Sequence, residues 1–481
     1  MVRTRVSVAA AVVCGVAALA QASGRASEPV ERAPIELAVP ADAEALLAQW
    51  AERSAGAPDL SSEYAAALEP MAAGDEYDVQ LDLMSAGWLT PADALWPTLV
   101  AYHNRHAERF ARLRELAAHP RHGSAVLGDG EAMAEMLREL AAAEGVDTSD
   151  RPPMLAIDLP FELFVPGGQL REAYRIVQME LMLMVGRGDS DGAAGALAAA
   201  IGLAQRSSSQ PAMLGHLTHL ALVNASLGRV PETISHGPGL LDDGQLAALS
   251  ARVAALDPIG AMERAIADEH AVVSLDMVAA RRWVAERTRA ERSLRGAAAL
   301  SLMAMNSTDD LIALHENLSR QVIERVRRGR LEPWRVEPAR LWRVPDVGVQ
   351  MVMQMESMAP RFVELALVAE ARRRATLVGL AAERYRLRTG AQPTSQAELV
   401  DAGLLAQPLR SVFSDGVLRI AAIDDGVRVY DVGPDGVDGG GLERCDRAAL
   451  SEWARGEGDM PAGDVVRWTT LRSDHVNDEV D

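Results

Sequence analysis

At 481 residues the chain is long enough for two or three domains, and its 49% of hydrophobic residues can fill real cores, which excludes a mostly disordered protein. All 48 basic residues are arginine, and 68 acidic residues outweigh them to give a formal net charge of −20. This excess argues against DNA, RNA and anionic membranes as partners, because their binding depends on basic side chains that neutralise phosphates.

The N-terminus has the form of a secretory signal peptide. Arg3 and Arg5 precede an uncharged apolar run over residues 6–20, and a small-x-small cleavage signal ends at Ala22. We therefore expect residues 1–22 to be removed and the mature chain to be exported, to the periplasm or the extracellular space. No later run is long and apolar enough to span a bilayer, so no membrane span is expected after cleavage.

The chain contains two cysteines. Cleavage after the signal would remove Cys14 and leave Cys445 alone. No intrachain disulfide is then possible, so the mature fold must depend on core packing.

Residues 23–168 are predicted to form an N-terminal helical region that ends in a loop-rich linker. Between residues 41 and 118, alanine and leucine are interleaved with glutamate and arginine in a helical pattern, with a break near Leu89-Thr90-Pro91. The stretch that follows carries Arg151-Pro-Pro153 and Val165-Pro-Gly-Gly168, which are typical of a connection between elements.

Residues 169–349 are predicted to form an array of helical hairpins. Apolar residues recur every three or four positions over residues 170–184 and 194–204, and Gly186–Gly192 turns the chain between these two helices. Two more helices follow the same pattern, and Asp242, with glutamine three residues later, has the spacing of a capping box. No clean repeat period links the pairs, so we expect an irregular array, solenoid- or bundle-like.

Residues 350–481 are predicted to form a long helix, to about residue 388, and then a small α+β domain. Val417–Ile420 and Val427–Tyr430 are short β-rich segments, and Asp424-Asp425-Gly426 between them is a tight-turn signal. The expected fold class is therefore mainly α, with a short antiparallel sheet in the small C-terminal domain.

Two C-terminal segments carry a resemblance. Leu380–Pro393 holds a tyrosine near a predicted helix end and a Gly-x-x-Pro step, and Val427–Gly441 reads VRVYDVGPDGVDGGG. In this order and spacing, residues 376–441 resemble the C-terminal part of the type II secretion major pseudopilins. The hydrophobic N-terminal helix of pilins, with its processing motif, is absent here, which argues against assembly into a pilus.

The resemblance implies a calcium site. By motif position Asp435 would be the first ligand and Asp464 the second, and Asp438 with backbone carbonyls would complete the oxygen shell that a hard cation requires. Leu442–Pro461 separates the glycine run from Asp464, which departs from the family pattern. The alternative is a glycine-rich structural turn whose aspartates accept local backbone hydrogen bonds.

A second resemblance is broader and covers residues 95–441. Leu159-Pro160, Gly188-Asp189 and Leu241–Leu246 follow one another in an order similar to large uncharacterised exported helical proteins of planctomycete-type bacteria. This resemblance implies architecture and export only.

Catalytic motifs are missing. No glutamate stands in the metalloprotease position of His-Glu-x-x-His, and the string Gly188-Asp-Ser-Asp-Gly192, which has Gly-x-Ser-x-Gly spacing, follows a helical pattern instead of the strand that a nucleophile elbow requires. We therefore nominate no catalytic residue and no organic cofactor. Six of the ten histidines do form His-x-x-His pairs, which could offer two imidazoles on one helix face, although surface or half-buried histidines are the default expectation. The pairs are His103 and His106, His119 and His122, and His216 and His219.

The sequence therefore favours an exported non-enzymatic scaffold or interaction protein of the cell envelope, with a protein or peptide as its partner. The alternative is an exported hydrolase whose site is assembled from separated acids and histidines. A pocket with convergent Asp, Glu or His side chains would favour the hydrolase, and a shallow groove lined by small apolar side chains would favour the scaffold.

Overall fold

The computed structural model describes residues 32–41, 43–54, 60–71, 75–118, 165–208, 212–290, 307–334, 347–423, 426–441, 445–456 and 459–469. The predicted signal peptide, Cys14 and the pair His119 and His122 lie outside these residues. Most of the predicted linker, residues 119–164, also lies outside them.

Short helices make up the N-terminal region, as the sequence predicts. They are α2 (Ala43–Ser54), α3 (Ser61–Leu68), the 3₁₀ helix η1 (Glu69–Met71), α4 (Asp75–Ser85), α5 (Trp96–Arg105) and α6 (Ala107–Ala118). The predicted break is a non-helical connection between α4 and α5, where the Asp93 carboxylate accepts hydrogen bonds from the N–H and hydroxyl of Thr90 at 2.6 and 2.7 Å. Aspartate and threonine stabilise turns in this way.

Longer helices form the centre of the molecule. They are α10 (Val165–Arg187), α11 (Ser190–Ser207), α12 (Ala212–His236), α13 (Asp243–Ala254), α14 (Pro258–Ala290), α16 (Thr308–Arg328) and α17 (Val347–Thr389). The predicted hairpin of α10 and α11 is confirmed: Gly188 turns the chain with a φ of 69°, and the Asp189 side chain caps α11 by accepting from the N–H of Gly192 at 2.9 Å. The predicted capping box at the start of α13 is also present, with Asp242 and Gln245 bonded reciprocally at 2.7 and 3.0 Å.

One predicted boundary is wrong in detail. Val165-Pro-Gly-Gly168, expected to be part of the linker, is the first turn of α10. Proline is tolerated in a first helical turn because the N–H that it lacks would have no intrahelical partner there.

The C-terminal part is the predicted small α+β unit. Its elements are α18 (Gln396–Asp401), β1 (Arg419–Ile423), β2 (Gly426–Asp431), α19 (Arg447–Ala454) and β3 (Val465–Thr469). The predicted hairpin pairs β1 with β2 antiparallel, with Ile423 opposite Gly426. The structure adds β3, which the sequence analysis did not predict, antiparallel to β2 on its other side.

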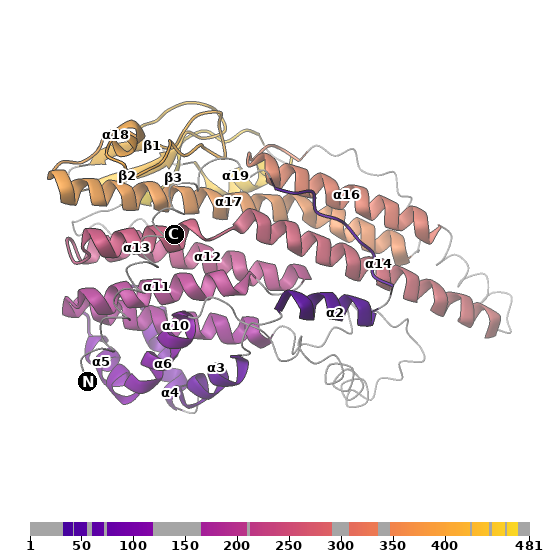
Figure 1. The fold of residues 1–481 in the computed structure, drawn as a ribbon, viewed down its shortest axis with the longest axis horizontal. Helices are drawn as coiled ribbons and strands as arrows, with labels where there is room; N and C mark the ends of the chain where they lie inside the picture. Colours follow the sequence, from indigo (N-terminus) through magenta and orange to yellow (C-terminus); the bar gives the residue numbers. More distant parts are fainter. Residues whose placement is uncertain are drawn as a thin grey trace, which may run out of the picture.

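The elements stack in layers that roughly follow the chain (Figure 1). Helices α3 to α6 lie against α10, α11 packs between α10 and α12, and α17 packs on α13, α14 and α16. The sheet covers the opposite face of α17, with β2 and β3 in contact with the helix. The protein is therefore mainly α with a small C-terminal α+β region, as predicted.

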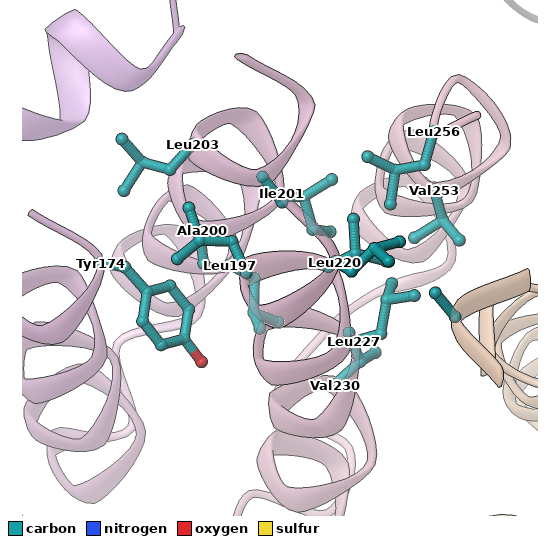
Figure 2. Close-up of a cluster of buried hydrophobic side chains, with 14 of the residues drawn as sticks. Tyr174, Leu197, Ala200, Ile201, Leu203, Leu220, Leu227, Val230, Val253 and Leu256 are labelled. Atoms are coloured by element: carbon teal, nitrogen blue, oxygen red, sulfur yellow. The ribbon is translucent and has the colours of Figure 1, made fainter. Parts of the chain in front are cut away.

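Most of the layers share one large apolar core, and a smaller separate cluster around Val273, Met277 and Leu311 lies between α14, α16 and α17. Buried side chains form a continuous cluster that reaches from Leu37 to Trp468, and Figure 2 shows its centre, where α10, α11, α12 and α13 meet through residues such as Leu197, Leu220 and Val253. Burial of such surface is the main favourable term in folding. None of the described helices is long and apolar enough to cross a membrane.

Candidate functional site

The glycine-rich loop after β2 touches the segment that leads into β3. Gly433 has no room for a side chain, because a Cβ there would collide with the carbonyl oxygen of Gly463. Gly441 ends the loop with a φ of 73°, a conformation that side chains strongly disfavour. The glycines therefore let two backbone segments that are distant in sequence come into direct contact.

Asp435 holds this contact closed. Its Oδ1 accepts a hydrogen bond from the N–H of Val437 at 3.1 Å, which stabilises the turn itself. Its Oδ2 accepts from the N–H of Gly463 at 3.1 Å, which joins the loop to the segment before β3. One carboxylate thus links the two segments.

Asp464 is the second residue of this junction and is completely buried. Its Oδ2 accepts from the N–H of Gly441 at 2.7 Å, and its backbone carbonyl accepts from the N–H of Cys445 at 2.9 Å. Its Oδ1 is buried without a hydrogen-bond partner among the described residues. A buried carboxylate oxygen without a donor is energetically costly, so a bound cation or donor would relieve it.

Asp438 points elsewhere. Its Oδ1 accepts from the hydroxyl of Tyr430 at 2.9 Å and from the N–H of Gly440 at 3.0 Å, while its Oδ2 lies 3.7 Å from Nε of Arg419. Burial of the Tyr430 phenol, together with its hydrogen bond to this carboxylate, raises the pKa of Tyr430. Asp438 therefore acts within the sheet and loop rather than at the Gly463 junction.

Two of the three predicted ligands, Asp435 and Asp464, are thus brought to one place. In the part of the chain that the structure describes, no group of three or more His, Cys, Asp or Glu side chains is arranged to hold a metal ion. A calcium ion at this junction would need backbone carbonyl oxygens beside the two carboxylates, which is within the range of ligands that calcium accepts.

The sequence analysis missed two charged residues of β2, Arg428 and Asp431. A guanidinium nitrogen of Arg428 donates to the carbonyl of Gly441 at 2.9 Å, and Asp431 is completely buried opposite Val465, the residue after Asp464. The only sequence signal was a charged residue within a β-rich segment, which is usually taken to point to solvent. Because β2 is the central strand of the sheet, every residue along it is buried.

Comparisons with known proteins add no name to this site. No protein-family model matches the sequence, no curated protein matches it, and no solved structure matches the chain.

The histidine pair on α12 lies in the core. His216 and His219 are buried, their ring centroids lie 5.4 Å apart, and Nδ1 of His219 lies 2.8 Å from the carbonyl oxygen of Ala204. Burial lowers the pKa of both imidazoles, that of His219 to about 4, so both are neutral at physiological pH. They are more buried than the expected surface or half-buried histidines, and no third ligand joins them among the described residues.

The histidine pair at the junction of α5 and α6 is His103 and His106. Each of its imidazoles lies near a different carboxylate. Nε2 of His103 lies 3.7 Å from Glu180 on α10, whereas Nε2 of His106 lies 3.1 Å from Glu76 on α4. The two imidazoles therefore reach different helices, and only that of His106 is hydrogen-bonded to its glutamate.

Proposed function

We propose that this protein is an exported scaffold of the cell envelope whose C-terminal loop is held closed by a calcium ion and presents a surface to a protein partner. The observation that carries the proposal is the buried Oδ1 of Asp464, which lacks a hydrogen-bond partner among the described residues. The resemblance of this segment to pseudopilins supports the choice of calcium.

The chemistry of the junction fits a hard cation. Asp464 and Asp435 supply two carboxylates, and Gly463 brings its carbonyl oxygen against the loop. Calcium takes six to eight oxygen ligands in flexible geometry, so carbonyl oxygens can complete a set that two carboxylates begin. A bound cation would also offset the repulsion between the buried carboxylate of Asp464 and the half-buried carboxylate of Asp435.

The same junction exposes apolar side chains. The side chains of Val437 and Met460 are exposed to solvent, with relative exposures of 62% and 55%. These are the highest values among the exposed large apolar residues of the described chain. Val437 follows Asp435 by two residues, and Met460 precedes Gly463 by three, so both flank the hydrogen bond that joins the segments. A contiguous exposed apolar patch can mark a protein interface, and we propose that these two side chains belong to one.

Thermal melting of residues 23–481 with calcium and with chelator tests the cation. Calcium is expected to raise the midpoint of the parent, because a ligand that binds only the folded state stabilises it by mass action. Asp464→Asn should abolish that shift. Asp438→Asn is the matched control, since its carboxylate serves Tyr430 and Arg419 instead. An equal calcium shift in parent and Asp464→Asn, or none in the parent, would contradict the cation site.

A pull-down with the calcium-loaded chain tests the partner surface. We expect Val437→Ser with Met460→Ser to release a partner that the parent retains, without a change in the calcium shift. Retention by both proteins would contradict this surface, and measurable turnover of envelope ester or glycoside substrates would favour the hydrolase alternative instead.

A further inference from the structure

A polar cavity lies beside the junction of α5 and α6, far in sequence from the C-terminal loop. It has a volume of about 660 Å³ and opens between α3 and the start of α6. Its charged and titratable lining residues are Glu63, Arg105, His106, Glu108, Arg109 and Arg112. Three arginines and two glutamates line the cavity, so guanidinium groups gather here although the whole chain is strongly acidic.

Arg109 and Arg112 lie three residues apart on one face of α6, and Arg105, the last residue of α5, lines the same cavity. Arg105 pairs with Glu76, Arg109 donates to the carbonyl of Ala66 at 2.9 Å, and Arg112 donates to Glu115 at 2.7 Å. These contacts fix the side chains. A guanidinium has five N–H donors, so each arginine keeps donors for a ligand.

His106 also lines the cavity. The imidazole is buried, and Nε2 lies 3.1 Å from the Glu76 carboxylate, which orients the ring. Burial lowers the pKa of His106, and the nearby charges of Arg105 and Arg109 lower it further. Helix α6 begins at Ala107, so its first backbone N–H groups border the same cavity, where the C-terminal end of α5 also lies.

We propose that this cavity is a binding site for a phosphate group, either inorganic phosphate or a small phosphomonoester. Guanidinium groups recognise phosphate through paired, charge-assisted hydrogen bonds, and a helix N-terminus adds to the attraction. The lining contains no serine, threonine or cysteine among its described residues, so the cavity binds and does not supply a hydroxyl or thiol nucleophile. The site is independent of the calcium loop.

Isothermal calorimetry on residues 23–481 with inorganic phosphate, glycerol phosphate, sulfate and acetate tests the proposal. Saturable phosphate binding is expected. Arg112→Gln should weaken it by about tenfold, because one charge-assisted contact is lost. The fold should tolerate this change, since the partner of Arg112 is the exposed Glu115.

Two further variants sharpen the test. Glu108→Gln removes a negative charge from the lining and should tighten phosphate binding severalfold. Arg320→Gln is the matched control, because Arg320 pairs with Glu316 in the same exposed manner on α16 and should leave the affinity unchanged.

The arms of the calorimetry distinguish the ligands. Tighter binding of glycerol phosphate than of inorganic phosphate would assign the site to a phosphomonoester, and the reverse order would assign it to the free ion. Absence of saturable phosphate binding, stronger binding of acetate than of phosphate, or equal losses in Arg112→Gln and Arg320→Gln would each overturn the proposal.

Discussion

The Nδ1 atoms of His270 and His315 lie 2.9 Å apart, and both imidazoles are completely buried between α14 and α16. A hydrogen bond between them requires one Nδ1 to carry a proton and the other to accept it, so the accepting imidazole is neutral. Burial lowers the pKa of both histidines, and the neighbouring imidazole lowers that of His315 further, to about 3.

We expect acid to destabilise the protein through this pair. Unfolded histidines take up protons near pH 6.5, whereas in the fold the pKa of His270 is lowered and that of His315 is about 3, so the stability from the neutral pair is complete above about pH 6.5 and decreases as the pH falls toward 3. Urea unfolding measured from pH 7 to pH 4.5 checks this. In the double variant His270→Leu with His315→Leu, the free energy of unfolding should depend less steeply on pH. The loss of slope should correspond to up to about two protons taken up on unfolding. The same slope in the parent and the double variant would contradict the assignment.

Glu370 on α17 is expected to be essential for stability. Its carboxylate is buried and bonds to Arg373 at 2.7 and 2.8 Å and to Arg374 at 2.8 Å. Burial alone would raise the pKa of Glu370, but the two guanidinium groups outweigh it and lower the pKa to about 2. Glu370→Ala should cost about 3–5 kcal/mol in the free energy of unfolding, because it leaves a buried guanidinium unpaired.

The control is an exposed pair of similar spacing. Glu316→Ala on α16 breaks its ion pair with Arg320, which is half exposed, and should cost less than about 1 kcal/mol. Denaturant unfolding of both variants makes the comparison. Equal losses would contradict a buried role for Glu370.

Gly379 on α17 is expected to be irreplaceable because a Cβ there would collide with the indole ring of Trp468 on β3. Gly379→Ala should lower stability by about 1–3 kcal/mol, as overpacking does. Trp468→Leu should relieve the collision in the double variant. Gly195→Ala on α11 is the matched control: nothing lies within 4 Å of its Cβ position, so it should stabilise the helix by about 0.5–1 kcal/mol. A Gly379→Ala protein as stable as the parent would contradict this packing.

Asp242 is expected to contribute about 1 kcal/mol by capping α13, and Asp242→Ala should lose that amount while Asp242→Asn keeps most of it. Gln245 also accepts from the hydroxyl of Ser190 at 2.7 Å and donates to Asp191 at 2.9 Å, so the cap joins α13 to the start of α11. A double-mutant cycle between Asp242 and Gln245 should therefore show coupling, and additive losses would contradict a capping box.

The elements that could be predicted carry local signals. The hairpin of α10 and α11 has apolar periodicity on both sides of Gly188-Asp189, and α13 has its capping box within four residues. Strands β1 and β2 are adjacent in sequence. Strand β3 was not predicted from the sequence. Its partner β2 ends more than thirty residues earlier, and local sequence patterns do not indicate pairing over such a separation.

In the candidate sites, too, the local features could be predicted from the sequence and the contacts between distant residues could not. The sequence placed Asp435 and Asp438 in one glycine-rich loop, but the separation of their roles depends on Gly463 and Tyr430, which they contact after folding. His106 was noted only as half of a spaced pair. Its contact with Glu76, which belongs to another helix, could not be read from spacing.

By itself the sequence determined the helical class, the turns and caps, the small C-terminal sheet and the acidic charge, because these depend on residues within a few positions of one another. Only the tertiary structure decided which charged groups are buried, from Asp464 and Glu370 to the neutral pair of His270 and His315. Burial depends on which segments pack together, and that is set by the summed contacts of the whole core rather than by any local pattern.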